Sequence, residues 1–208
     1  ILSADILKLE EEVQHLDKNG ADYIHIDIMD GHYVPNITFG PNIVKSLRKV
    51  TSKILDVHLM IKPVKQYIND FVEAGSDIIS FHPEADDNPE EIIKMISDAE
   101  IKAGIAIHPD VNIADIDHLF SKVQQIIVMT VTPGFGGQKF MYDQVQKIKD
   151  LDEIRKNNNY KYEIAVDGGV NNENAKICKE NGADVLAVGS YLLSQNQNNY
   201  SKIINSLR

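Results

Sequence analysis

The sequence has very little cysteine and no long apolar run. Cys178 is the only cysteine among 208 residues, so an internal disulfide and a metal site built from several cysteines are both excluded. A single cysteine is typical of a reducing compartment, so we predict a cytoplasmic protein. The sequence begins at Ile1 without methionine, so the possibility that an organelle leader was removed stays open. No apolar run reaches the roughly 18 residues of a membrane-spanning helix, so no membrane partner is expected.

An excess of positive charge is missing too. Lys and Arg total 21 against 31 Asp and Glu, which gives a formal net charge of −10. Without a basic stretch the chain lacks the electrostatic footprint of a nucleic-acid-binding protein. Any bound anion must therefore be held by local backbone N–H groups or by a few side chains. The length and the balance of 43% hydrophobic and 25% charged residues fit one globular domain over residues 1–208.

Apolar, β-branched runs alternate with amphipathic stretches along the whole chain. We predict strands at residues 23–29, 54–60, 77–82, 104–108, 125–131, 161–167 and 184–189. Residues 1–4 resemble the end of an eighth strand. Helices are predicted at residues 9–20, 64–75, 89–99, 141–155, 172–180 and 191–207, and residues 156–160 are predicted to form a surface loop.

Alternating strands and helices predict right-handed βαβ units and a parallel sheet. Eight such units in this length fit a (β/α)8 TIM barrel. The alternative is an open doubly wound sheet, which usually carries a Gly-x-Gly-x-x-Gly turn after its first strand. Here the strand that comes first in the chain ends within residues 1–4. It is followed by Ala4-Asp5-Ile6-Leu7, without glycine, so the barrel is favoured.

Polar residues occur inside two predicted strands that should be apolar on both faces. In residues 23–29, isoleucines alternate with His25 and Asp27, so a period of two places these polar residues on the inner face. Residues 54–60 repeat the pattern with Asp56 and His58, and residues 161–167 end at Asp167. Carboxylates are almost never buried without a partner.

The carboxyl ends of all barrel strands converge on one face, where active sites lie. We therefore predict a four-ligand site for one divalent ion, Zn²⁺, Fe²⁺, Mn²⁺ or Co²⁺, formed by His25, Asp27, His58 and Asp167. The alternative is that the four are separate polar residues, each with its own partner.

Other residues near the strand ends are open to more than one interpretation. Met29, Met60 and Met129 are either core filler or a sulfur-lined wall beside the reacting centre. His82 and His108 also follow strands, and we assign neither a role.

Glycine follows three consecutive predicted strands. Such turns let a backbone close around an anion, and barrels often bind phosphate with the loops after strands seven and eight. We therefore predict a phosphate site at Gly134, Phe135, Gly136, Gly137, Gly168, Gly169, Gly189 and Ser190.

The motifs together resemble those of the ribulose-phosphate 3-epimerase family, in the family's order and over essentially the whole chain. They are Ile1-Leu2-Ser3-Ala4-Asp5, His25-Ile26-Asp27-Ile28-Met29-Asp30-Gly31, Val34-Pro35-Asn36, Asp56-Val57-His58-Leu59-Met60, Phe81-His82-Pro83-Glu84-Ala85, Pro133-Gly134-Phe135-Gly136-Gly137-Gln138 and Val166-Asp167-Gly168-Gly169-Val170-Asn171. Two small departures, His108 before Pro109 and Thr132 before Pro133, concern loops only.

The resemblance implies a ribulose-phosphate-binding barrel that interconverts ribulose 5-phosphate and xylulose 5-phosphate in the pentose phosphate pathway. It implies one metal ion on the four ligands named above, and Asp27 and Asp167 as acid and base. With residues 1–4 counted as the first strand, Asp27 comes from the second and Asp167 from the seventh, so we expect the barrel mouth to separate them by a gap that a sugar could fill. It also implies sugar contacts from Ser3 and His58, phosphate contacts from the glycine turns, and a homo-oligomer, often a dimer.

Three alternatives remain at this point. A hexulose-phosphate epimerase would have nearly the same motifs. A sugar-phosphate decarboxylase on a similar barrel would need no proton return to the opposite face. A non-catalytic barrel that senses a sugar phosphate would have no reason to keep two inward carboxylates.

Overall fold

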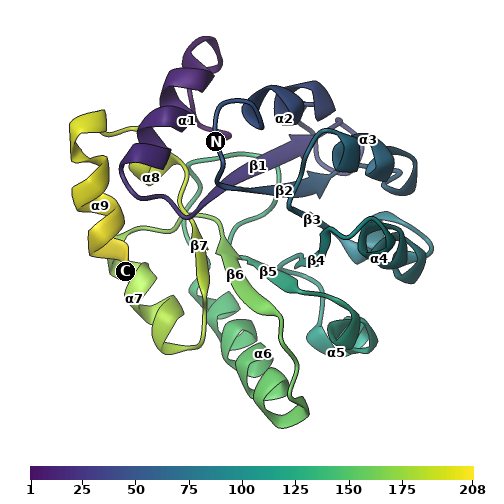
Figure 1. Cartoon of the computed structure of the whole chain (residues 1–208). Coiled ribbons are helices and arrows are strands. Elements are labelled where there is room, and N and C mark those ends of the chain that lie inside the picture. Colours follow the sequence, from purple (N-terminus) through teal and green to yellow (C-terminus); the bar gives the residue numbers. More distant parts are fainter.

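Seven parallel strands wrap into a nearly closed barrel, and the helices lie outside it (Figure 1). The computed structural model describes all residues from 1 to 208, and each strand is hydrogen-bonded to the next in chain order. The strands are β1 (Tyr23–Met29), β2 (Ile54–Met60), β3 (Ile78–Phe81), β4 (Lys102–Ile107), β5 (Gln125–Met129), β6 (Glu163–Asp167) and β7 (Val185–Ala187).

The outer layer consists of helices that follow the strands. They are α1 (Leu9–Lys18), α2 (Pro41–Leu47), α3 (Ile68–Glu73), α4 (Pro89–Asp98), α5 (Ile113–Ile116), α6 (Val145–Asn158), α7 (Asn172–Glu180), α8 (Ser190–Leu193) and α9 (Tyr200–Leu207). Short 3-10 helices lie at Ile6–Lys8, Lys65–Tyr67, Pro83–Ala85, Asp117–Lys122, Tyr142–Gln144 and Gln197–Asn199. None of the helices combines the length and apolarity needed to cross a membrane.

The alternation predicted for residues 23–29 is confirmed. Ile24, Ile26 and Ile28 are buried in the main core between the barrel and its helices. The parallel register pairs β1 with β2 so that Asp27 lies beside His58. The polar side chains of both strands therefore share the inner face, as the period of two requires.

The eighth strand predicted at residues 1–4 is wrong. The N–H of Ala4 donates to the carbonyl of Ile1 at 3.1 Å, so this segment folds back as a turn. One hydrogen bond joins it to β1, in which the backbone nitrogen of Ile1 donates to the carbonyl of His25 at 2.8 Å. No ladder joins β1 to β7, so the barrel stays open between these two strands.

Two predicted helical boundaries also differ from the structure. The helix predicted over residues 191–207 is divided into α8 and α9, because the Asn196 side chain accepts from the N–H of Asn198 and forms a turn between them. Residues 156–158 continue α6 instead of forming a loop, and Asn159 ends that helix in the left-handed conformation. The helices α2 and α5 were not predicted from the sequence.

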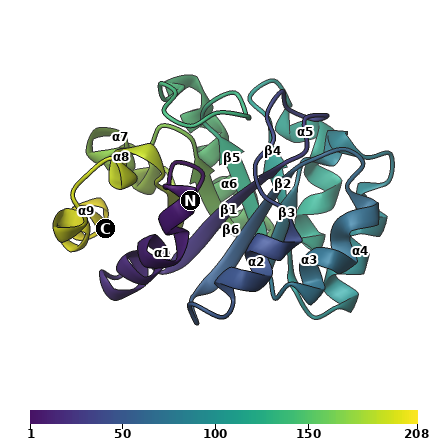
Figure 2. The same cartoon turned by 90° about the horizontal axis from the view of Figure 1, so that it is seen from above.

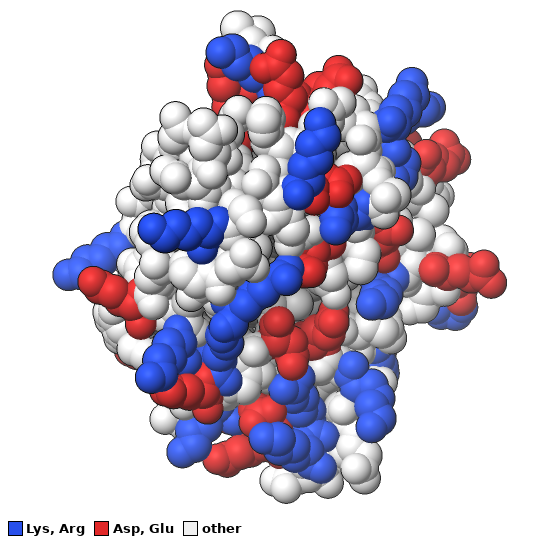
Figure 3. Space-filling model, turned by 60° about the vertical axis from the view of Figure 1, so that its left-hand side comes forward, with Lys and Arg blue, Asp and Glu red and all other residues white.

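The two ends of the chain are tied together on one side of the barrel. Figure 2 shows α9 on the same side as α1, and the hydroxyl of Tyr200 donates to Glu12 at 2.5 Å. On the face drawn in Figure 3, basic and acidic side chains are interspersed, without a continuous basic surface.

Candidate active site

Four side chains from three strands meet at the carboxyl ends of the barrel. His25 and Asp27 come from β1, His58 from β2 and Asp167 from β6. Each offers one nitrogen or oxygen atom, and these atoms all lie within 4.8 Å of one another. The convergence predicted from the sequence is therefore present in the structure.

The spacing of these atoms matches the edges of a metal coordination shell. Nε2 of His25 lies 3.4 Å from Asp27 Oδ1 and 3.7 Å from Asp167 Oδ2, and Nδ1 of His58 lies 3.4 Å and 3.5 Å from the same two oxygens. These distances exceed ordinary hydrogen bonds. Tetrahedral ligands about 2.0–2.1 Å from a zinc ion are roughly 3.3–3.4 Å apart.

The two imidazole nitrogens in this cluster have no hydrogen-bond partner although they are buried. A buried polar atom without a partner is costly, and such atoms call for an explanation. A cation between them would satisfy both nitrogens and both carboxylates. The donor set therefore fits one divalent ion.

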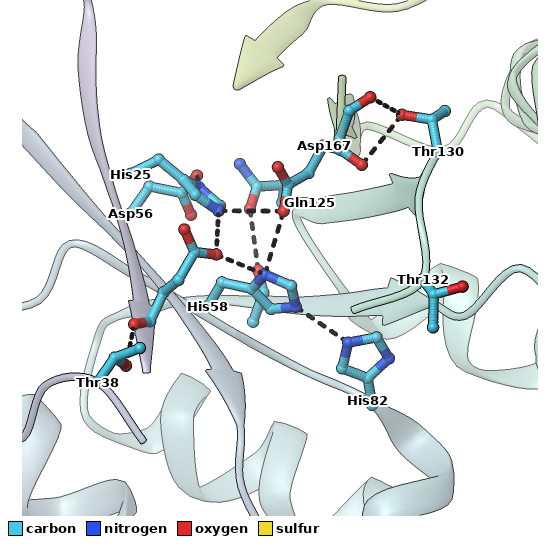
Figure 4. A network of polar contacts seen from close by, with 12 residues as sticks. His25, Thr38, Asp56, His58, His82, Gln125, Thr130, Thr132 and Asp167 are labelled. Carbon is cyan, nitrogen blue, oxygen red and sulfur yellow. Dashed lines mark hydrogen bonds and ion pairs between the residues drawn. The ribbon is translucent and has the colours of Figure 1, made fainter. Parts of the chain in front are cut away.

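Each histidine is held by its other ring nitrogen (Figure 4). Nδ1 of His25 lies 2.8 Å from Asp56 Oδ2, and Nε2 of His58 lies 3.0 Å from Nε2 of His82. Asp56, His58 and His82 are fully or almost fully buried. Partners of this kind orient metal-binding imidazoles.

Charge in the cluster is balanced between imidazole and carboxylate. Burial alone would raise the pKa of Asp27, but His25 and His58 lower it well below its usual value. Burial and the charge of Asp27 both act to raise the pKa of Asp167, and the two histidines outweigh them and lower it. Burial disfavours charged His25, yet Asp56 and Asp27 raise its pKa well above the usual value.

The ends of β1 and β6 are held by threonine hydroxyls. Thr38 donates to the carbonyl of Asp27 at 2.6 Å and accepts from the N–H of Met29 at 3.0 Å. Thr130 contacts the carbonyls of Asp167 at 3.0 Å and Gly168 at 2.6 Å. These contacts fix the backbone directly below both carboxylates.

The two aspartates come close together through one oxygen each. Asp27 Oδ1 and Asp167 Oδ2 both belong to the cluster, so they lie within 4.8 Å of each other. The second oxygen of each carboxylate accepts no side-chain or backbone hydrogen bond. Whether a sugar lies between the two carboxyl groups stays a prediction.

A cavity of 1140 Å³ opens above the cluster and continues between β1 and β7. It is lined by Asp27 and Asp167, by the methionines and by the predicted phosphate residues. Among all the predicted site residues only His58 is absent from the lining, and its side chain is fully buried. Met29 and Met60 pack on each other with Val34, whereas Met129 belongs to the cluster inside the barrel.

The predicted phosphate residues separate into two groups. Near Gly136 the loop is so tight that an added Cβ would lie 2.8 Å from Ser3 Oγ. A Cβ on Gly189 would lie 3.8 Å from the same oxygen, and one on Gly137 would lie 4.0 Å from Ser190 Oγ. Three turns distant in sequence thus form one small concave surface, which we name the Ser3 cradle.

At Gly168 and Gly169, close packing against neighbouring residues already explains why glycine is present. A Cβ on Gly168 would lie 2.5 Å from the Val131 side chain, and one on Gly169 would lie 2.8 Å from backbone atoms of residues 138 and 140. The carbonyl of Gly169 also accepts from the Asn174 side chain at 3.0 Å. Phe135 is 54% exposed at the mouth of the cavity.

The prediction from sequence left the role of His82 open. Its position after a strand, in Phe81-His82-Pro83-Glu84-Ala85, was the available signal. Burial lowers the pKa of His82 to about 4, so this imidazole is neutral at pH 7. His108, the other unassigned histidine, lies in a small separate cavity with Tyr33 and Glu84.

Comparison with known proteins decides the family. Residues 1–193 match the model of the ribulose-phosphate 3 epimerase family. The chain belongs to this family. It is therefore an enzyme of the epimerase class, which excludes the decarboxylase and non-catalytic alternatives.

Curated relatives agree with the family model over the full chain. The ribulose-phosphate 3-epimerase of Bacillus subtilis (strain 168) is 44% identical over 209 residues, covering 100% of this chain and 95% of the relative. That of Escherichia coli (strain K12) is 39% identical over 210 residues, covering 100% and 92%.

Solved structures with low sequence identity share the fold. A mutant tryptophan synthase alpha-subunit from Pyrococcus furiosus has a TM-score of 0.72 at 14% identity, covering 99% of this chain and 93% of that one. Tryptophan synthase subunit alpha from Campylobacter jejuni has a TM-score of 0.67 at 16% identity, covering 98% and 91%. These likenesses show the barrel alone.

Proposed function

We propose that this epimerase interconverts ribulose 5-phosphate and xylulose 5-phosphate by moving the proton on C3. The observation that carries the proposal is the meeting of Asp27 and Asp167 at one point, reached from β1 and from β6. In the chain without a metal ion, the two histidines lower the pKa of each carboxyl group. A substrate over the cluster would meet one of the two carboxyl groups on each side.

Epimerisation next to a ketone needs this arrangement. One carboxylate removes the C3 proton, the substrate passes through an enediolate, and the other carboxylic acid returns a proton to the opposite face. A single group on one face would require the intermediate to turn over in the site. The second oxygens of Asp27 and Asp167, which accept no hydrogen bond within the protein, would carry the proton.

A divalent ion would be held by His25, Asp27, His58 and Asp167. When bound, such an ion supplies Lewis-acid stabilisation of negative charge developing on the substrate oxygens. The four side chains hold their donor atoms in place before binding, because Asp56 and His82 anchor the imidazoles. Thr38 and Thr130 hold the two strand ends.

The other end of the substrate fits the Ser3 cradle. Ser3, Gly136, Gly137, Gly189 and Ser190 bring hydroxyl groups and backbone N–H groups to one concave surface on the same cavity. The chain carries no basic cluster there, so a phosphate would be held mainly by hydrogen bonds. Phosphate binding and proton transfer would then take place in one cavity.

The test is a chiral assay of ribulose 5-phosphate turnover, with and without a chelator. We expect xylulose 5-phosphate as the product, with the rate lost on chelation and restored by a divalent ion. A parallel assay with allulose 6-phosphate decides between pentulose and hexulose. Failure to convert either sugar, by metal-loaded and folded protein, would contradict the proposal.

The family resemblance carries two further expectations. They are a homo-oligomer, of two or more copies, and a place in the pentose phosphate pathway of the cytoplasm. Sedimentation at several protein concentrations would measure the first.

A further inference from the structure

The buried imidazole of His82 takes no part in the proposed proton transfer. It follows the end of β3, has no exposed surface, and lies against the metal-site histidine His58. The two Nε2 atoms are 3.0 Å apart, and the ring centroids are separated by 5.1 Å. At this distance a hydrogen atom lies between the two nitrogens.

The cluster determines which nitrogen carries that hydrogen. Nδ1 of His58 faces Asp27 and Asp167, and a nitrogen that binds a metal ion must offer its lone pair. A neutral imidazole then carries its single proton on the other nitrogen. His58 therefore donates from Nε2 and His82 accepts at Nε2, so His82 carries its own proton on Nδ1.

The surroundings of His82 fit that tautomer. Its Nδ1 makes no hydrogen bond, and the carboxylate oxygen Glu84 Oε1, which accepts from the Tyr33 hydroxyl at 2.8 Å, lies 3.5 Å from it. The Tyr33 ring stacks on the imidazole, with centroids 4.6 Å apart and 29° between the planes. A carboxylate accepts only, so it favours a proton on Nδ1 and leaves Nε2 as an acceptor.

We infer that His82 is a positioning residue that fixes the tautomer and ring orientation of His58, so that Nδ1 faces the metal ion. The Tyr33 ring stacks on His82, and the Glu84 carboxylate lies near its Nδ1. The other histidine ligand, His25, is held by a buried carboxylate, Asp56, so the two ligands are oriented by different means. This inference rests on the proposed metal site.

A purely structural role for His82 predicts a different response to substitution. His82→Leu keeps an apolar side chain of similar size but leaves Nε2–H of His58 without an acceptor. His82→Gln keeps an acceptor oxygen at the same reach. If His82 only fills space, the two variants should not differ in metal affinity beyond their effect on folding.

The experiment measures Zn²⁺ affinity of the full chain by competition with a chromophoric chelator. Loss of a partner that orients a metal ligand weakens binding about 10- to 100-fold, and we expect this for His82→Leu. His82→Gln should recover most of the affinity, and His118→Gln, at an exposed position far along the chain, should bind as wild type. Thermal unfolding of the metal-free variants reports folding separately.

A second measurement needs no variant. In Zn²⁺-loaded protein labelled with ¹⁵N-histidine, we expect His58 to carry its proton on Nε2, with a ¹⁵N–¹⁵N coupling to Nε2 of His82 across the hydrogen bond. Coordination of His58 through Nε2, or wild-type Zn²⁺ affinity in folded His82→Leu, would overturn the inference. If the wild-type chain bound no Zn²⁺, the proposed metal site itself would be wrong.

Discussion

Asp27 and Asp167 are 140 residues apart in the chain, yet each places one carboxylate oxygen beside Nε2 of His25, at 3.4 Å and 3.7 Å. The strands that carry them, β1 and β6, are not neighbours in the sheet. The closed curvature of the barrel brings them together. Two acidic groups can therefore share one cation and still approach a substrate from different directions.

Removal of one imidazole should empty the metal site. His58→Ala deletes a ligand and leaves two buried carboxylates with one fewer partner, so most of the metal should be lost. Elemental analysis of protein purified without chelator would show near-stoichiometric metal in wild type. His118→Ala, at an exposed histidine outside the site, is the control. Full metal content in folded His58→Ala would show that the ligand set is wrong.

Metal binding should release protons, and metal affinity should fall as the pH is lowered. In the metal-free protein, burial disfavours charged His25, but Asp56 and Asp27 outweigh it and raise its pKa well above 6.5, so it is protonated at pH 7. A ligand imidazole must be neutral, so Zn²⁺ has to displace this proton. Calorimetry at pH 7 in buffers of different ionisation enthalpy should show that about one proton or more is released for each Zn²⁺ ion bound. Binding without proton release would contradict the assignment of His25.

Much of the site was predictable because a strand has a period of two. Isoleucine at alternate positions identified the outer face of β1, and this placed His25 and Asp27 inward. The orientation of each imidazole was not predictable. It depends on Asp56 from β2 and on His82 after β3, whose distances from the ligands follow from barrel curvature.

The end of the barrel at residues 1–4 was mispredicted for a related reason. Four residues with apolar character look like a strand in sequence, but a strand needs a ladder. Here the N–H of Ala4 donates back to Ile1, and a single hydrogen bond joins the segment to His25. The order of apolar residues in so short a segment does not show whether it forms a turn or pairs with the edge of the sheet.

A side chain on the Ser3 cradle should weaken substrate binding. Gly137 has φ of +73°, and an added Cβ would point toward Ser190 at 4.0 Å. Gly137→Ala should raise KM roughly tenfold or more, the scale of losing a hydrogen bond to a charged group. Gly20→Ala is a matched control, since Gly20 also has positive φ, at +97°, with no atom within 4 Å of an added Cβ. Equal KM values in the two variants would show that Gly137 does not take part in substrate binding.

Neutralising either carboxylate should abolish epimerisation while leaving the metal in place. Asp27→Asn and Asp167→Asn keep the shape and an oxygen donor but remove the proton carrier, so turnover should fall about 10²- to 10⁴-fold. Metal content is measured on each variant first, so that loss of the ion is not mistaken for loss of the base. In deuterated water each variant should still exchange the C3 proton of one epimer only, and the two variants should differ in which epimer exchanges, because the remaining carboxylate lies on one face. If a metal-loaded Asn variant at either position epimerised at nearly the wild-type rate, a water molecule would have to carry the proton and the aspartates would be ligands alone.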